Sequence, residues 1–381
     1  MEAGSSGLGL YVHIPFCQAK CSYCDFNSFA GLEDLFDDYV RGLVRELQWL
    51  EPVQVKTIYI GGGTPTVLPL PHLAQLLRTM QSALALAPRA EISIEANPGT
   101  VDAAKLEGLR LLGVNRLSLG VQSFDDEELS RLGRVHGATQ AADAFCAARQ
   151  AGFDNVGLDL IYGLPGQALA AWQGSLGRAL DLHPDHLSLY ALSVEASTPL
   201  AATIARGELP AQDPDLAADM YELAQELLSA AGFVHYEISN WARTPGHVCR
   251  HNLTYWRNEA YLGVGAGAHS WRNGRRWSNT AQPGNYVAQV LDGQRPVAGE
   301  ETISPALEMG ETMIMGLRLL EEGVSCRRFR QRFGTDPGTS FPDEIKELAG
   351  LGLLHTDGNG VRLTSRGRLL GNQVFVRFLP D

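Results

Sequence analysis

Tyr11-Val-His-Ile-Pro-Phe-Cys17-Gln-Ala-Lys-Cys21-Ser-Tyr-Cys24 is the stretch that decides the fold. Its three cysteines lie within eight residues, directly after the predicted strand Leu10–Phe16. Thiolates are the ligands that iron–sulfur clusters select, and three of them leave one iron of a four-iron cluster free for a small molecule. Zinc is the structural alternative, with His13 or another residue as fourth ligand. Lys20 and Ser22 make the loop polar, which disfavours a chance grouping of buried cysteines.

Working outward from this loop, short β-branched runs alternate with helical patterns up to about residue 195. Such alternation is typical of a parallel sheet. Six units predict an α/β fold, a partial TIM-like (β/α)6 barrel, with a doubly wound sheet as the alternative. The predicted strands are Leu10–Phe16, Lys56–Ile60, Glu91–Ala96, Arg116–Gln122, Val156–Ile161 and Leu187–Val194. The predicted helices are Leu35–Leu50, Pro71–Leu86, Ala103–Leu112, Thr139–Ala151 and Leu169–Leu180.

The pattern changes in the second half of the chain. A stretch rich in Pro and Ala, Thr198–Pro214, interrupts it, and a helix at Asp215–Ala231 and a strand at Val234–Ile238 follow. The next stretch, Asn240–Trp277, holds four of the six tryptophans. From about Thr302 helices return, and two short strands end the pattern. The predicted domains are a partial barrel at 1–232, an aromatic-rich extension at 233–300 and a C-terminal α+β winged-helix-like region at 301–381.

Composition excludes several classes of protein. The net charge of −12 argues against nucleic acid as a partner, since phosphate binding needs clustered Lys and Arg. No run of eighteen apolar residues predicts a membrane-spanning helix. Met1–Gly9 has neither a basic nor an apolar signal region, so a cytoplasmic location is expected. The isolated Cys146, Cys249 and Cys326 are interpreted as small buried residues rather than as a disulfide framework.

Each predicted strand has one apolar face and one small or polar face. A polar barrel lumen indicates that a ligand occupies the space. On Arg116–Gln122 the polar face starts with the arginine itself, and Gly61–Gly63 lets the backbone approach a ligand closely. Glu95, Gln122 and Asp159 lie near strand C-termini, where β/α barrels keep their active sites. Pairing of the carboxylates with an arginine is the structural alternative.

The Cys-x3-Cys-x2-Cys spacing, with Tyr11-Val-His-Ile-Pro-Phe before it, resembles the radical S-adenosylmethionine (SAM) superfamily, in its coproporphyrinogen dehydrogenase-like branch. The resemblance covers nearly the whole chain. It implies that Cys17, Cys21 and Cys24 hold a [4Fe–4S] cluster whose free iron binds SAM. The positions that match SAM contacts in the family are Tyr11, Gly62, Gly63, Thr64, Glu95, Gln122, Arg134 and Asp159, together with Tyr23 against the adenine and Ser193.

A second motif lies far down the chain. His251-Asn252-Leu-Thr-Tyr255-Trp256 matches the His-Asn-x-x-Tyr-Trp motif of the HemW heme-chaperone family. A neutral imidazole is a suitable axial ligand for heme iron, and aromatic rings suit a porphyrin face. The resemblance implies that these four residues bind heme. From the residues alone, His251 also reads as a hydrogen-bonded core histidine, and His247 and Cys249 are alternative ligands.

Two departures separate the chain from coproporphyrinogen dehydrogenase. Phe26 stands where that enzyme has a further cysteine, and only nine residues precede Leu10. The resemblance therefore favours a heme chaperone that binds the cluster, SAM and heme and delivers heme to apo-hemoproteins. The alternative is an oxygen-independent coproporphyrinogen III dehydrogenase in porphyrin biosynthesis. A structural zinc protein is a third reading. The family associates dimerisation with the cluster and heme, while oligomeric state, SAM cleavage, catalytic residues, electron donor and recipient proteins stay open.

Overall fold

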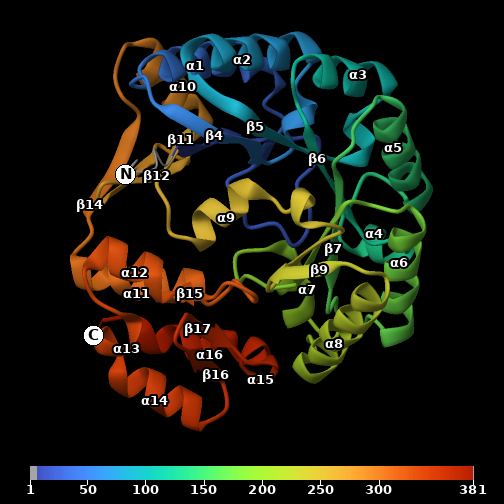
Figure 1. Cartoon of the computed structure of the whole chain (residues 1–381). Helices are drawn as coiled ribbons and strands as arrows, with labels where there is room; N and C mark the ends of the chain where they lie inside the picture. The colour runs from blue at the N-terminus through green and yellow to red at the C-terminus, as the bar shows by residue number, and fades with distance from the viewer. Residues whose placement is uncertain (1–6, 381) are drawn as a thin grey trace.

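The computed structural model describes residues 7–380, and its centre is a twelve-stranded sheet that curves into a partial barrel (Figure 1). The ends of the predicted terminal domains, Met1 and Asp381, lie outside the described residues. The strands of the first half are β1 (Leu8–Ile14), β4 (Gln54–Gly62), β5 (Ala85–Ala96), β6 (Arg116–Gln122), β7 (Val156–Tyr162) and β8 (His186–Ala191). They are parallel and lie beside one another in chain order, as the barrel prediction requires. A doubly wound sheet would reverse its order at a switch point, so this alternative is wrong.

Helices pack on the outer face of these strands and at their C-terminal ends. They are α1 (Phe36–Gln48), α2 (Leu70–Ala83), α3 (Ala103–Leu111), α4 (Asp126–Arg131), α5 (Ala138–Gln150), α6 (Leu169–Asp181), α7 (Pro199–Ala205) and α8 (Pro214–Ala230). In α1 the apolar residues Tyr39, Val40, Leu43 and Leu47 repeat at helical spacing, and all four are fully buried against the sheet. Full burial of one such side chain stabilises the fold by roughly 1.5–3 kcal/mol. The six predicted helices, Asp215–Ala231 included, are confirmed within three residues at their ends. Helices α4 and α7 were not expected, and α7 lies within the interruption predicted at Thr198–Pro214.

Residues 233–300 extend the same sheet at both edges. Their elements are β9 (Val234–Glu237), β10 (Asn240–Ala242), α9 (Arg250–Trp256), β11 (Tyr261–Val264), β12 (His269–Arg272), β13 (Arg275–Asn279), α10 (Pro283–Leu291) and β14 (Val297–Thr302). Two of these strands, β10 and β9, continue from β8, while β11 pairs with β1 as a further parallel strand and leads into β12–β14. The boundary predicted between 300 and 301 falls inside β14. This segment therefore completes the barrel sheet from both sides.

The short helix α9 crosses from one sheet edge to the other and packs against β1 and β4, at the centre of Figure 1. No side chain next to it in sequence caps its start. Instead the carboxylate of Glu91, the seventh residue of β5, accepts hydrogen bonds from the backbone N–H groups of Arg250 (2.9 Å) and His251 (3.0 Å). Those N–H groups have no partner within a helix, so a distant carboxylate stabilises this one.

The C-terminal region forms a core of its own, drawn in orange and red in Figure 1. Its elements are α11 (Pro305–Gly316), β15 (Val324–Ser325), α12 (Cys326–Phe333), α13 (Pro337–Ser340), α14 (Pro342–Gly350), β16 (Leu354–Asp357), β17 (Gly360–Leu363), α15 (Ser365–Leu369) and α16 (Gly371–Phe375). Helix, strand, helices and an antiparallel strand pair follow one another, with β15 paired to β17. The winged-helix-like α+β prediction is confirmed. Among residues 7–380, no helix is long and apolar enough to cross a membrane.

Candidate functional site

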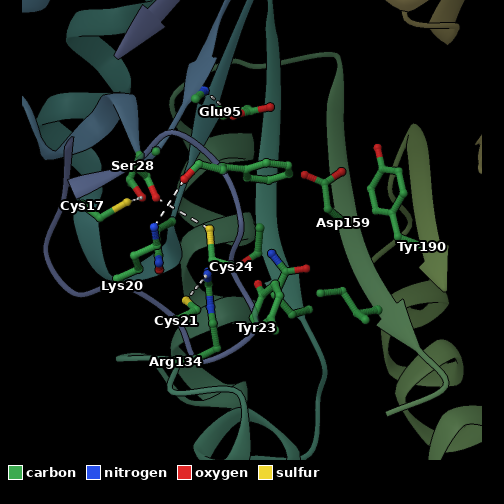
Figure 2. Close-up of a pocket in the computed structure, with 18 of the residues that line it drawn as sticks. Cys17, Lys20, Cys21, Tyr23, Cys24, Ser28, Glu95, Arg134, Asp159 and Tyr190 are labelled. Carbon is green, nitrogen blue, oxygen red and sulfur yellow. Dashed lines mark hydrogen bonds between the residues drawn. The ribbon is translucent and has the colours of Figure 1, made fainter. Parts of the chain in front are cut away.

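A cavity of about 540 Å³ lies between the cysteine loop and the polar faces of β4–β8 (Figure 2). Figure 2 shows the cysteines on one side of it and Asp159 and Tyr190 on the other. All but one of the residues predicted for the cluster and SAM line this cavity. They are Cys17, Cys21, Tyr23, Cys24, Gly62, Gly63, Thr64, Glu95, Gln122, Arg134, Asp159 and Ser193.

The three cysteines stand on a loop that other elements hold in place. The Cys17 thiol accepts a hydrogen bond from the Thr64 hydroxyl (3.7 Å), and Cys24 Sγ lies 3.6 Å from Ser28 Oγ. Cys21 Sγ accepts from the Arg134 guanidinium (3.4 Å). Among the described residues, no three His, Cys, Asp or Glu side chains are grouped tightly enough to share one metal ion. The thiols line one side of the cavity instead, and a donor set of three sulfurs with nearby hydrogen-bond donors suits an iron–sulfur cluster.

Tyr11 is the predicted SAM residue that does not line the cavity. Its side chain and that of His13 share one face of β1, and the Tyr11 hydroxyl lies 2.9 Å from His13 Nδ1. The other ring nitrogen of His13 bonds the backbone oxygen of Asn27 (2.9 Å). The Tyr11 ring stacks on Tyr59, which lies between it and the lumen. His13, proposed as a zinc ligand, therefore has both ring nitrogens engaged elsewhere.

The glycines at the end of β4 are required by close contacts with β1 and with the cysteine loop. Gly62 adopts φ +120°, where side chains are strained, and a Cβ there would meet the His13 ring at 2.6 Å. A Cβ on Gly63 would meet the backbone oxygen of Phe16 at 2.7 Å and Cys17 Sγ at 2.9 Å. The glycine run thus lets the end of β4 pass directly beneath the cluster ligands.

Two half-buried carboxylates face the cavity without an arginine partner. Glu95 accepts hydrogen bonds from the Tyr59 hydroxyl (2.7 Å) and the N–H of Gly62 (3.2 Å). Asp159 accepts from the Ser118 hydroxyl at 3.1 Å. Burial raises the pKa of both groups, that of Glu95 to about 7. Neither forms an ion pair within residues 7–380, so the predicted structural alternative of an arginine pair is wrong. Neutral donors hold both carboxylates where a cationic ligand would meet them.

The other predicted residues surround the same space. Arg134 donates to the backbone oxygen of Gly120 (2.6 Å) as well as to the Cys21 thiol, and so ties the cysteine loop to β6. Gln122 ends β6 at φ +67°, a conformation that non-glycine residues rarely adopt and that is frequent at functional sites. Ser193 donates to Glu195 (2.7 Å) at the rim. Phe26, which replaces the further cysteine, is 70% exposed and also lines the cavity.

Sequence reasoning assigned no role to several residues of the cavity wall. Ser188 and Tyr190 come from β8, and Arg116 is the first residue of β6. Arg116 is 2% exposed and lines the lumen. The alternation of side chains along β6 already placed Arg116 on the polar face with Ser118 and Gln122. A charged residue in a buried strand could therefore have identified Arg116 as a residue of the site.

The predicted heme motif lies on α9, beside the lumen. His251 is 1% exposed, with Nδ1 2.9 Å from the Thr57 hydroxyl and Nε2 2.9 Å from the Tyr255 hydroxyl. Burial lowers the pKa of His251 to about 3, so its imidazole is neutral. Asn252 reaches the cavity, whereas the Trp256 ring lies under the guanidinium of Arg318 (4.3 Å).

The alternative ligands His247 and Cys249 lie near the same helix. His247 lies 3.9 Å from Asp185, and Cys249 is fully buried with its sulfur 3.8 Å from Glu91. His251 itself stacks on Tyr59 with ring centroids 5.2 Å apart, and Tyr59 lines the cavity. The structure therefore connects the motif to the lumen through Asn252 and Tyr59.

Comparisons with known proteins agree with this geometry. The model of the radical SAM superfamily matches residues 11–176, and the model of the HemN C-terminal domain matches residues 303–370. The heme chaperone HemW of Bacillus subtilis (strain 168) is 40% identical over 97% of this chain and 99% of its own. HemW of Escherichia coli (strain K12) is 39% identical over 98% of each chain.

A mouse relative and a solved structure extend the comparison. The mouse protein, radical S-adenosyl methionine domain-containing protein 1, mitochondrial, is 36% identical over 100% of this chain and 89% of its own. The structure of coproporphyrinogen III oxidase (HemN) from Escherichia coli, described as a radical SAM enzyme, superimposes with a TM-score of 0.85. It is 26% identical and covers 98% of this chain and 90% of its own.

Proposed function

The chain belongs to the HemW family, and from this premise we propose that it is a heme chaperone, which binds a [4Fe–4S] cluster, SAM and heme and delivers heme to apo-hemoproteins. Identity near 40% along the full length of proteins named heme chaperones is the observation that carries the proposal. The cluster and SAM follow from the radical SAM superfamily, and the three cysteines on one cavity supply the ligands.

The lining of the cavity supports SAM as its ligand. SAM carries a permanent positive charge on its sulfonium group and an amino and a carboxylate group at one end. Glu95 and Asp159 present carboxylates to the cationic groups, and Arg134 presents a guanidinium beside Cys21. When bound, the cluster and SAM would supply one-electron chemistry, while the residues of this chain bind and orient the cofactor.

SAM binding is expected to depend on pH through Glu95. With a pKa of about 7, Glu95 is ionised above that pH and protonated below it. The ionised form attracts the cationic ligand, so SAM affinity is expected to rise about tenfold from about pH 6 to about pH 8. Isothermal titration of the cluster-loaded protein measures this. Glu95→Gln is the control and should flatten the profile, whereas an unchanged slope in this variant would assign the dependence to another group.

For heme, we propose His251 as the axial ligand. Its neutral imidazole suits heme iron, but Nε2 is held by the Tyr255 hydroxyl, so iron binding requires that hydrogen bond to open. The stacked Tyr59 ring lies between His251 and the lumen and would move with it. The hydrogen bond between His251 and Tyr255 is thus made without heme and is broken when heme binds.

An anaerobic heme titration tests the proposed ligand. His251→Ala is expected to weaken heme binding by about tenfold or more, while Tyr255→Phe, which frees Nε2, should keep or increase affinity. Absorption spectra of the cluster-loaded protein measure both, and thermal unfolding checks that each variant folds. If His251 is only a core residue, both variants lose stability and neither changes heme affinity. Failure of the wild-type protein to bind heme would contradict the chaperone proposal itself.

The dehydrogenase reading is tested in parallel. Anaerobic incubation with SAM, a reductant and coproporphyrinogen III should yield no protoporphyrinogen above a control without SAM. Product above that control would replace the chaperone proposal with the enzyme.

All six cysteines are unpaired in the structure, which fits a reducing compartment and the cytoplasmic location that we propose.

A further inference from the structure

The part of the cavity at Arg116, the first residue of β6, is called its floor. It holds a buried cation, the Arg116 guanidinium, without a hydrogen-bond partner. Arg116 is 2% exposed, and its side chain reaches the lumen. Within residues 7–380 its guanidinium makes neither a hydrogen bond nor an ion pair, and Nε is fully enclosed without a partner. A buried guanidinium normally gains several hydrogen bonds, because leaving it unpaired is costly. The fold therefore keeps a charged donor group free at this point.

The acidic groups around Arg116 are already satisfied by other donors. Glu91 accepts from the two backbone N–H groups that start α9, Glu95 from Tyr59 and Gly62, and Asp159 from Ser118. Burial opposes the charge of Arg116, yet neighbouring Cys249 and Glu91 hold its pKa above its ordinary value, so it stays charged. The donors of Arg116 are thus available to a ligand rather than to the protein.

Two further buried polar atoms near Arg116 lack partners. Ser93 lies directly opposite Arg116 in the register of β5 and β6, and its hydroxyl is unpaired. His186 enters from β8, where Nδ1 is unpaired and faces the space left by Gly157. Neither of these side chains lines the cavity, so of the three groups only Arg116 presents its donors to a ligand there.

This floor lies away from the cluster. Arg116 begins β6 and Gln122 ends it, and six residues of extended strand span roughly 20 Å. The residues beside Arg116 are instead those of the heme motif. Asn252 lines the same cavity, and the charge of Arg116 helps burial to lower the pKa of His251. A ligand on Arg116 would therefore lie next to the motif.

We infer that Arg116 binds a carboxylate, a propionate arm of the heme held at His251 and Asn252. This inference rests on the proposed function and extends it to the residue that binds a carboxylate of the heme. One guanidinium beside the neutral His186 matches a single negative charge, and Glu95 and Asp159 nearby disfavour a doubly charged phosphate.

Heme and its dimethyl ester, which lacks both carboxylates, separate the possibilities. The cluster-loaded wild-type protein is expected to bind heme about tenfold more tightly than the ester. Arg116→Gln should remove this preference by weakening heme binding about tenfold while leaving the ester unchanged. Arg116→Lys, which keeps the charge, should retain part of it. Arg78→Gln, an exposed arginine on α2, is the matched control and should change neither.

The possible results are distinct. Equal binding of heme and ester by the wild-type protein, or an equal loss of both in Arg116→Gln, would overturn the inference and leave the chaperone proposal standing; the floor would then hold water only. Binding of neither compound would overturn the chaperone proposal and the inference with it. Thermal unfolding provides a second readout. Arg116→Gln should not lower the melting temperature, because no hydrogen bond is lost, whereas a structural arginine would show a clear decrease.

Discussion

Cys24→Ser is expected to lower the iron content of the anaerobically reconstituted protein from about four atoms per chain to nearly none. The loop supplies three thiolates, and the other cysteines are poorly placed to replace one. Cys249 is fully buried beside Glu91, and Cys146 is exposed on the outer helix α5. Iron and sulfide analysis, together with the visible absorption of the cluster, measures the loss.

Cys146→Ser is the matched control for this experiment. It removes an exposed thiol outside the cavity and should leave the iron content unchanged. Undiminished iron in Cys24→Ser would show that Cys24 is not a ligand. Zinc without iron in the wild-type protein would instead support the structural zinc reading.

Gly63→Ala is expected to weaken SAM binding by at least about tenfold and to reduce cluster occupancy. The added Cβ would lie 2.7 Å from the backbone oxygen of Phe16 and 2.9 Å from Cys17 Sγ, distances at which something must move. Neither contact is the end of a flexible side chain, so the substitution displaces a cluster ligand or the end of β4. Equilibrium binding of SAM and iron analysis measure the two effects.

Gly174→Ala on α6 is the control, because nothing lies within 4 Å of the Cβ that it adds. This substitution should leave SAM affinity unchanged and stabilise the helix by about 0.5–1 kcal/mol. SAM affinity that is equal in Gly63→Ala and the wild-type protein would contradict the assignment of the glycine run to the cofactor site.

Features that depend on neighbours along the chain were predictable. The cysteine spacing, the glycine run and the carboxylates at strand ends are local patterns, and the alternation of side chains on a strand predicts which of them share a face. The strand predicted at Arg116–Gln122 has the same bounds in the structure. Glu95, Gln122 and Asp159 meet in one cavity because the C-termini of parallel strands meet at one end of a barrel.

Features that depend on residues far apart were missed. The pairing of β11 with β1 joins residues about 250 positions apart, and no local periodicity specifies it. Helix α9 is seven residues long and is capped by Glu91, 160 positions before His251, so its own sequence lacks a start signal. Tyr11 was assigned to SAM by its motif, but its hydroxyl bonds His13 and its ring lies behind Tyr59.

The sequence by itself determined the family, the cluster ligands and the succession of strands and helices, because these depend on spacing and periodicity within short segments. Only the tertiary structure decided where the heme motif lies and which groups remain without partners. His251 is buried and doubly hydrogen-bonded, while Arg116 is buried and free. Whether a buried polar group is satisfied depends on every strand that surrounds it, and that information exists only once the strands have assembled into the sheet.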